Sequence, residues 1–430
     1  MTAAAAVEWR RSRRAFVTLR DAPNSTSDQQ PATSNLSEAT LHALWAGQRF
    51  PAAALVTEGG ELLRVLHPGR PGRGPGPDFR DALIGAPGGR TLRGDVELHV
   101  RAADFAGHGH DRDRRYDRVV LHLVFDAGGA RETALASGRR VPVVALGSWA
   151  RRRAGELAAW LRSPTLWREP CHDAIARLGA EEVARRIDAL GETRLAQRIQ
   201  ALADGIECLG AGEALYRALL AGVGYGVEGA PFAAIAKVLP AEVLCGRVSS
   251  APAAKRVALA ETLLLERAAP AAPGLSSSRP ANHPARRLAG LARLTVRHLP
   301  LLAGEPPELP ERPAELIAAW TVAADGEWRR SLAPGRPARR PPGALIGRSR
   351  AIELLTNAVL PWASALGATR ARELLASLPA PGRYGSLAFL EANLGDGERR
   401  PPLTARRQQG LLALYKTECT QGGCGRCPLS

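Results

Sequence analysis

The stretch Gly94-Asp95-Val96-Glu97-Leu98-His99-Val100 alternates polar and apolar side chains residue by residue. Successive side chains of a β-strand point to opposite faces, so the alternation predicts a strand. The apolar members are expected to face a core: Val96, Leu98 and Val100. The polar members are expected to share the other face: Asp95, Glu97 and His99. The pattern therefore predicts three potential metal ligands on one side of one strand.

The segments around this strand predict a small α/β domain. Ser37 is a suitable N-cap for a helix with apolar residues at helical spacing. The run 119–125 is almost wholly apolar, as expected of a strand covered on both faces. Part of the polar segment 102–117 is expected to be helical. Further strands are predicted at residues 62–66, 79–84 and 141–146.

From Trp149 onward the spacing of apolar residues becomes helical. The fold class predicted is an α/β N-terminal domain with a mixed sheet, followed by a mostly α-helical C-terminal region. We expect four parts along the chain: a disordered leader at 1–35, the α/β domain at 36–150, a helical region at 151–415 and a cysteine-containing tail at 416–430.

Composition and charge limit the classes of function. The 430-residue chain is 45% hydrophobic and 23% charged, which is ordinary for a globular protein. Its net charge of +16 indicates a polyanionic partner such as DNA, but the excess of Arg over Lys is equally typical of a GC-rich genome. No apolar run approaches the roughly 20 residues of a membrane span, and the N-terminus does not resemble a secretory signal. We therefore expect a cytoplasmic protein without a membrane partner; the oligomeric state is not predicted.

Asp78 precedes the strand predicted at 79–84 and is the carboxylate best placed to join Glu97. If the two strands pair as a hairpin, both carboxylates converge on one face. Carboxylates on a rigid sheet form an oxygen site suited to Mg²⁺ or Mn²⁺, which can activate water and offset charge on a phosphodiester. The alternative is a pair of exposed acids on a solvated strand face.

The polar segment that follows carries His108, His110, Asp111 and Asp113 within six residues. Two interpretations stay open: a second set of metal ligands beside phosphate-contacting arginines, or a loop whose side chains form turn hydrogen bonds. His122 lies within an apolar strand and is expected to be buried and hydrogen-bonded, with a reach into the site as the alternative.

The pairs Pro77-Asp78 and Glu97-Leu98-His99, with the order helix, three strands, helix, strand, resemble the PD-(D/E)XK nuclease superfamily. The resemblance implies a restriction-endonuclease-like sheet and a Mg²⁺- or Mn²⁺-dependent nuclease with Asp78 and Glu97 as metal ligands. It also implies an accessory role for Glu38. His99 stands where that superfamily has a lysine that orients or polarises the attacking water, so metal binding is a safer expectation than cleavage.

The chain also resembles a bacterial family known as domain of unknown function 2851, over most of its length. The resemblance brings no established activity. It rests on these motifs: Gly76-Pro77-Asp78-Phe79, Gly94-Asp95-Val96-Glu97-Leu98-His99, His108-Gly109-His110, Val119-Val120-Leu121-His122, Gly222-Val223-Gly224-Tyr225-Gly226, Ala281-Asn282-His283-Pro284, Thr356-Asn357-Ala358-Val359-Leu360-Pro361 and the C-terminal cysteines.

Three cysteines end the chain, Cys419, Cys424 and Cys427, at a spacing that can wrap one metal ion or cluster. Cys171 is the candidate fourth ligand. The layout resembles nucleases in which a distant cysteine and a C-terminal trio hold a [4Fe-4S] cluster, although the spacing differs; Zn²⁺ is an equal alternative on chemical grounds, and free thiols are the third reading.

Arginines of the helical region, such as Arg286, Arg287, Arg293 and Arg297, either follow a phosphate backbone or are solvated helix faces. The first hypothesis for the whole protein is a divalent-metal-dependent nuclease acting on DNA, with Asp78 and Glu97 on the metal and His99 positioning water. The second is a non-catalytic nucleic-acid-binding or scaffold protein that retains the fold. The third is a hydrolase of a small phosphate substrate that holds Zn²⁺ or Mn²⁺ with His99, His108 and His110.

Overall fold

The computed structural model describes residues 36–72, 74–165, 167–224, 229–271, 283–394, 402–421, 423 and 426–430. The predicted leader at 1–35 lies outside the described residues. The chain forms two compact units. The first holds the described residues up to Arg177, with Asn393, Leu394 and those from Tyr415 on; the second holds Leu178–Ala392 and residues 402–414. The boundary thus lies after Arg177 rather than at 150, and the tail belongs to the first unit.

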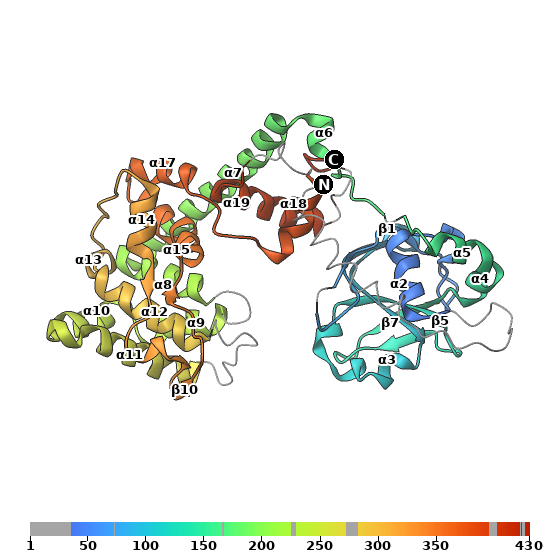
Figure 1. The fold of residues 1–430 in the computed structure, drawn as a ribbon, viewed down its shortest axis with the longest axis horizontal. Coiled ribbons are helices and arrows are strands. Elements are labelled where there is room, and N and C mark those ends of the chain that lie inside the picture. Colours follow the sequence, from blue (N-terminus) through green and yellow to red (C-terminus); the bar gives the residue numbers. More distant parts are fainter. Residues whose placement is uncertain are drawn as a thin grey trace. The chain divides into compact units, whose positions relative to one another are not determined.

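The first unit is built on a seven-stranded mixed sheet with the order β1-β3-β4-β5-β7-β6, in which β2 also pairs with β3 (Figure 1). Its strands are β1 (Arg64–His67), β2 (Arg70–Pro71), β3 (Phe79–Gly85), β4 (Thr91–Arg101), β5 (Val119–Asp126), β6 (Glu132–Ala134) and β7 (Arg140–Ala145). β3 and β4 are antiparallel, whereas β4 pairs with β5 and β5 with β7 in parallel. The predicted mixed sheet is confirmed; β2 and β6 are short strands that the sequence pattern did not indicate.

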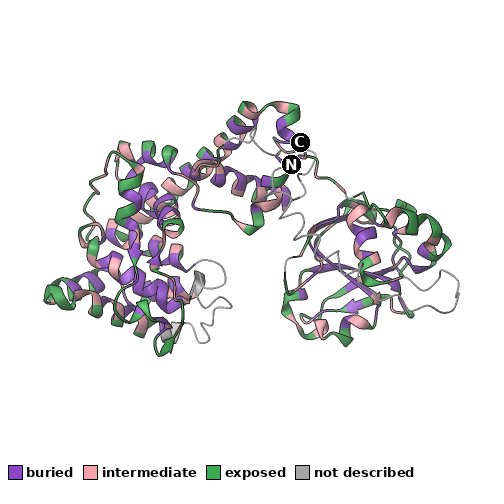
Figure 2. Cartoon of the chain, viewed as in Figure 1, coloured by how far each residue is buried: buried purple, intermediate pink, exposed green. Residues whose placement is uncertain are grey.

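β5 is the central strand, and every residue from Val119 to Phe125 is buried, as its apolar sequence predicts (Figure 2). β4 differs from the prediction in one respect. Its polar face is buried as well, with Asp95, Glu97 and His99 exposed by only 4%, 4% and 1%. A second layer of polypeptide therefore covers the side of the sheet that carries the ionisable groups.

The pairing of β3 with β4 leaves a gap that positions these groups. Phe79, the first residue of β3, pairs with Val96, so β4 runs on past the start of β3 from Glu97 to Arg101. The backbone of this extension pairs with β5 along one edge only. Asp78 lies directly before β3 and fills the other edge, where its Oδ2 accepts a hydrogen bond from the Leu98 amide at 2.9 Å.

Gly94 permits the close approach of β4 to the turn before β5. A Cβ at this position would lie 2.2 Å from the Arg118 carbonyl oxygen and 2.5 Å from Val120 Cγ1. No side chain larger than hydrogen fits there without moving backbone. The glycine thus sets the register at which Glu97 pairs with His122.

The helix α2 (Glu38–Gly47) covers one face of the sheet (Figure 1). Ser37 caps it as predicted, accepting a hydrogen bond from the Thr40 amide. Leu41, Leu44 and Trp45 enter the core with Val96, Leu98 and the apolar residues of β5. The same helix turns Glu38 and His42 toward Asp78.

The opposite face is covered by the chain between β4 and β5. This segment contains α3 (Asp104–Gly107) and the 3-10 turns His110–Arg112 and Arg114–Tyr116. Phe105 and Tyr116 anchor it in a small core with Val119. The apolar anchors leave His108 and His110 facing His99. Three further helices complete this part of the chain: α4 (Gly147–Arg152), α5 (Ala154–Leu161) and α6 (Ala174–Leu178).

The second unit is mainly helical, as predicted, around a large apolar core (Figure 2). Two short antiparallel strand pairs accompany its helices: β8 (Val322–Ala323) with β11 (Ala344–Ile346), and β9 (Ser331–Ala333) with β10 (Arg336–Pro337). The helices are α7 (Ala180–Leu209), α8 (Ala211–Val223), α9 (Gly229–Val238), α10 (Ala241–Ser250), α11 (Arg256–Ala271), α12 (Pro284–Arg297), α13 (Leu299–Leu302), α14 (Pro313–Trp320), α15 (Arg348–Leu354), α16 (Leu360–Ala365), α17 (Thr369–Ser377), α18 (Ala388–Asn393, ending in the first unit) and α19 (Ala405–Leu414).

The arginines of α12 differ in their exposure to solvent. Arg286 and Arg287 are 2% and 3% exposed, and Arg286 donates to the carbonyl oxygens of Trp328 and Pro342 at 2.9 and 2.8 Å. Arg293 pairs with Glu261 and Asp325. Arg286 and Arg287 therefore do not lie on a solvated helix face, whereas Arg297 is exposed and donates to the carbonyl oxygens of Ala319 and Thr321. DNA binding by these groups stays a prediction. In the described part of the chain, no helix is long and apolar enough to cross a membrane.

Candidate metal centre

Three histidines from two segments meet above the buried polar face of β4. His99 comes from the strand, and His108 and His110 come from the segment around α3. One ring nitrogen from each lies within 4.8 Å of those from the other two. His99 Nε2 is 3.2 Å from His108 Nδ1, and the His110 ring stacks on Tyr116 with centroids 4.0 Å apart. The histidines of this segment, together with His99, therefore form a potential ligand set.

Glu97 joins this triad from the same strand. Its Oε1 is 3.5 Å from His110 Nε2 and 3.9 Å from His99 Nε2. Its Oε2 accepts a hydrogen bond from the Asp78 amide at 3.1 Å. One carboxylate oxygen is thus fixed by backbone, and the other is presented to the histidines.

A second group lies beside the first. Glu38, His42 and Asp78 each offer a ligand atom within 4.8 Å of the other two, and His42 Nε2 is 3.1 Å from Asp78 Oδ1. Glu38, for which the resemblance implies an accessory role, thus lies close to Asp78. His42 was missed by sequence reasoning, although its spacing of four residues from Glu38 places both on one helix face.

A buried chain of hydrogen bonds supports His99 from behind. His99 Nδ1 is 3.0 Å from His122 Nε2, and His122 Nδ1 is 2.7 Å from the Thr133 hydroxyl oxygen. If His99 Nε2 is left unprotonated for a ligand, Nδ1 carries the proton and donates it to His122. His122 is thus both buried and in reach of the site, and it meets the two alternatives proposed for it.

Burial sets the protonation states in the cluster. Burial and the neighbouring His110 and His108 lower the pKa of His99 to about 4, and burial lowers the pKa of His122 to about 3. Both rings are neutral at pH 7, the form that binds metal ions. Burial and the Asp78 carboxylate raise the pKa of Glu97 to about 9, and the same two causes raise the pKa of Glu38.

Three predicted accessory carboxylates lie outside these groups. Asp95 accepts a hydrogen bond from the Asp81 amide at 3.0 Å and lies near Arg118. Asp113 caps a 3-10 turn and pairs with Arg115, and Asp111 lies 3.6 Å from Arg112. These contacts favour a structural role for all three aspartates. For Asp111 and Asp113 such a role was one of the two interpretations that the sequence left open.

The donor set indicates which ions fit. Three imidazoles with one carboxylate suit Zn²⁺, Mn²⁺ or Fe²⁺ better than Mg²⁺, which prefers oxygen ligands and bound water. The second group has two carboxylates and one imidazole, so it offers harder donor atoms than the histidine triad and suits harder cations. The arrangement could hold a Lewis acid close to groups that orient water.

Three of the predicted cysteine ligands, Cys171, Cys419 and Cys427, belong to the first unit. Cys171 and Cys419 are buried, whereas Cys424 lies outside the described residues. Arg177, at the end of the segment that carries Cys171, donates to the Leu429 carbonyl at 2.8 Å and ties the tail to α6. A metal site of Cys171, Cys419, Cys424 and Cys427 stays a prediction.

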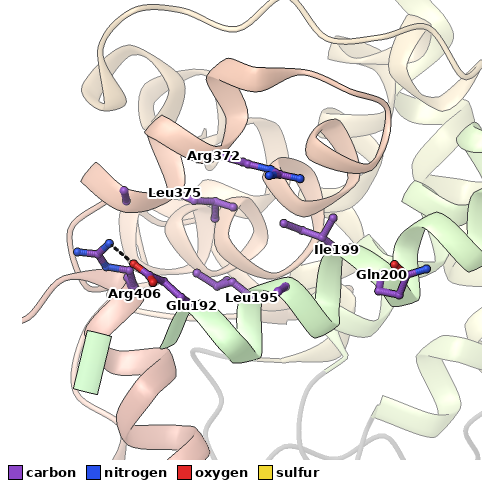
Figure 3. Close-up of a pocket in the computed structure, with 9 residues that line it drawn as sticks. Glu192, Leu195, Ile199, Gln200, Arg372, Leu375 and Arg406 are labelled. Atoms are coloured by element: carbon purple, nitrogen blue, oxygen red, sulfur yellow. Dashed lines mark hydrogen bonds and ion pairs between the residues drawn. The ribbon is translucent and has the colours of Figure 1, made fainter. Parts of the chain in front are cut away.

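The second unit contains a separate open pocket of about 490 Å³ between α7, α17 and α19. Figure 3 shows its apolar walls, formed by residues such as Leu195, Ile199 and Leu375, and the ion pair of Glu192 with Arg406 at its edge. Its lining residues include no histidine or cysteine. The convergent ionisable groups of the first unit are therefore the stronger candidate for chemistry.

No curated protein and no solved structure matches the chain. One family model, described as protein of unknown function (DUF2851), matches residues 38–272. The match spans the sheet and every member of the two ligand groups, whereas the motifs at Ala281 and Thr356 and the C-terminal cysteines lie beyond it. Because the matched segment is more than half of the 430 residues, the chain belongs to the DUF2851 family.

Proposed function

We propose that the first unit is a divalent-metal-dependent, nuclease-like hydrolase that acts on DNA phosphodiesters. The observation that carries the proposal is the convergence of His99, His108 and His110 within 4.8 Å, beside the buried carboxyl of Glu97. Mn²⁺ and Zn²⁺ are the proposed ions, since imidazoles dominate the ligand set.

The strand order supports a nuclease in particular. A helix, three antiparallel strands and a strand parallel to the third follow one another as α2, β1, β3, β4 and β5, with the short α3 between the last two. Asp78 precedes the second of these strands, and Glu97 lies on the third. The likeness to PD-(D/E)XK nucleases is part of this proposal, with His99 in the place of their lysine.

Each group has a chemical role in the proposal. A bound divalent ion would supply a Lewis acid and lower the pKa of water. His99, His108 and His110 would hold the ion, and the Oε1 of Glu97 would complete the set. Arg112, Arg114 and Arg115 are exposed in the segment between β4 and β5, and they offer positive charge to a phosphate backbone.

The test uses the purified full chain with Mn²⁺ or Zn²⁺ on single-stranded, linear and supercoiled DNA. We expect cleavage that a chelator stops and that Asp78→Asn and His108→Asn each lower by about 100-fold or more. The matched control is Asp113→Asn, in the same loop but paired with Arg115 at the surface, which keeps the activity.

The same variants separate the alternatives. The wild type could hydrolyse p-nitrophenyl phosphate but not DNA, and His108→Asn could lose this activity. That result would make a small phosphate ester, rather than DNA, the substrate. Metal-independent DNA binding without any cleavage would indicate a scaffold. Equal cleavage by wild type and both variants would contradict the proposed site.

A further inference from the structure

We propose that the centre is dinuclear, with a second divalent cation held by Glu38, His42 and Asp78 beside the ion of the histidine triad. This inference deepens the proposed function and rests on it for the first ion. The ligand class is a hard or borderline cation such as Mn²⁺, because two of the three donors are carboxylate oxygens.

The first step is the separation of the two ligand groups. His99, His108 and His110 form one set within 4.8 Å, and Glu38, His42 and Asp78 form another within the same limit. The sets share no residue. Each offers three donor atoms, which is the number that open, reactive metal sites use.

The second step is how the two central carboxylates divide their oxygens. Asp78 Oδ2 is held by the Leu98 amide at 2.9 Å, which leaves Oδ1 directed to His42 at 3.1 Å. Glu97 Oε2 is held by the Asp78 amide at 3.1 Å, which leaves Oε1 near His110 at 3.5 Å. Backbone amides thus preorganise one oxygen for each set.

The third step is charge. Glu38 and Asp78 offer carboxylate oxygens within 4.8 Å of each other, and the Asp78 amide donates to Glu97 Oε2 at 3.1 Å, so three carboxyl groups lie together. The ion pairs that the structure describes for Asp78 and Glu97 are with histidines alone. In a chain with 58 Lys and Arg residues, this acidic concentration is offset by no described arginine, and a cation supplies the missing charge.

The fourth step is access. His99 is 1% exposed, but His108 is exposed and the side chain of His110 is 17% exposed; the side chains of His42 and Asp78 are 29% and 21% exposed. Both ligand sets are therefore open to solvent, and a substrate can reach either ion. Two ions of this kind can bind both the attacking and the leaving oxygen of a phosphodiester, which agrees with a phosphate substrate.

The experiment titrates the metal-free full chain with Mn²⁺ and follows it by EPR, since thiolates bind this ion weakly and the cysteines then do not interfere. We expect two Mn²⁺ per wild-type chain with an exchange-coupled spectrum. His42→Asn should bind one uncoupled ion, and its affinity for the second should fall by at least about 10-fold. Glu38→Gln, at an exposed position that leaves the core intact, should give the same result.

Glu58→Gln, an exposed substitution in the same unit, is the control and should bind two ions. His108→Asn should also lose the coupled spectrum, because it removes a ligand of the ion in the histidine triad. One Mn²⁺ per wild-type chain, unaltered by His42→Asn and Glu38→Gln, would overturn the second site while leaving the triad and the proposed hydrolysis intact. Two coupled ions in a wild type that cleaves no phosphoester would instead uphold the second site and overturn the proposed function.

Discussion

The main chain of Asp78 donates a hydrogen bond to Glu97 Oε2 at 3.1 Å, while the Asp78 side chain accepts one from the amide that follows Glu97, that of Leu98, at 2.9 Å. The two acids are therefore locked to each other's backbone at the point where β3 begins beside β4. Two hydrogen bonds from backbone amides to side chains thus take the place of backbone–backbone hydrogen bonds between the strands. This arrangement explains how buried Glu97 and partly exposed Asp78 are held in fixed geometry by backbone amides.

Glu97→Gln tests whether the buried carboxyl costs stability in exchange for metal binding. Burial and Asp78 raise the pKa of Glu97 from 4.5 to about 9, so the folded state keeps a proton that the unfolded chain releases. Metal-free wild type should lose stability as the pH rises between these values, by at most about 1.4 kcal/mol per pH unit. The variant should lack this slope and be the more stable protein at pH 8. Thermal denaturation from pH 5 to 9 measures it.

Added Mn²⁺ should make wild type more stable than Glu97→Gln, which reverses the order expected without metal. Wild type gains stability from the ion, whereas Glu97→Gln should bind it at least about 10-fold more weakly and gain less. Parallel pH profiles for both metal-free proteins would contradict the assigned protonation of Glu97.

Alternation along 94–100 was enough to predict that Glu97 and His99 share a face, because strand geometry has a fixed period. It could not separate Asp95 from them. Asp95 lies at an irregularity in the β4–β5 register and turns to the Asp81 amide, a local shift that no sequence period encodes.

His42 shows a different limit of sequence reasoning. Its neighbours on α2 form an ordinary apolar stripe, and its proximity to Asp78 depends on where β3 starts relative to β4. The arginines of α12 show a third limit: a count of charges does not tell buried guanidinium groups from exposed ones, and Arg286 and Arg287 are buried.

Gly94→Ala tests the close approach that fixes the register of β4. The new methyl group would meet the Arg118 carbonyl oxygen at 2.2 Å, so backbone must move. We expect a loss of about 1–3 kcal/mol in the free energy of unfolding and weaker metal binding. Gly155→Ala is the control, because nothing lies within 4 Å of its Cβ position. Chemical denaturation compares the two, and equal stability of the alanine variants would show that the strand does not need the glycine.

Thr133→Val tests the hydrogen-bond chain behind His99. The change removes the partner of His122 Nδ1 at 2.7 Å and leaves a buried ring nitrogen unsatisfied. We expect a loss of about 1–2 kcal/mol of stability and a fall of about 10- to 100-fold in Mn²⁺ affinity. Thr133→Ser keeps the hydroxyl and should keep the affinity. If valine and serine give the same affinity, the chain does not orient His99.

Glu169→Gln tests an ion pair that holds the segment after α5 to the sheet, away from the ligand groups. Glu169 lies 3.0 Å from His67 Nε2 and 2.9 Å from Arg70 Nε. Burial opposes ionisation of Glu169, but the hydrogen bond from His67 and the charge of Arg70 outweigh it and lower its pKa below 4.5. The pair therefore stabilises the fold above the unfolded pKa, and this contribution is lost as the pH falls through the folded pKa.

At pH 7 the variant should be less stable by about 3 kcal/mol, because the largely buried Arg70 loses the counter-charge of Glu169. The difference from wild type should shrink steadily as the pH is lowered below about 4.5, where wild type loses the same interaction. Denaturation curves at a series of pH values measure both effects. Glu58→Gln, at the surface, should stay within about 0.5 kcal/mol of wild type throughout. A deficit in Glu169→Gln that is independent of pH would mean that shape, rather than the carboxylate charge, accounts for the role of this residue.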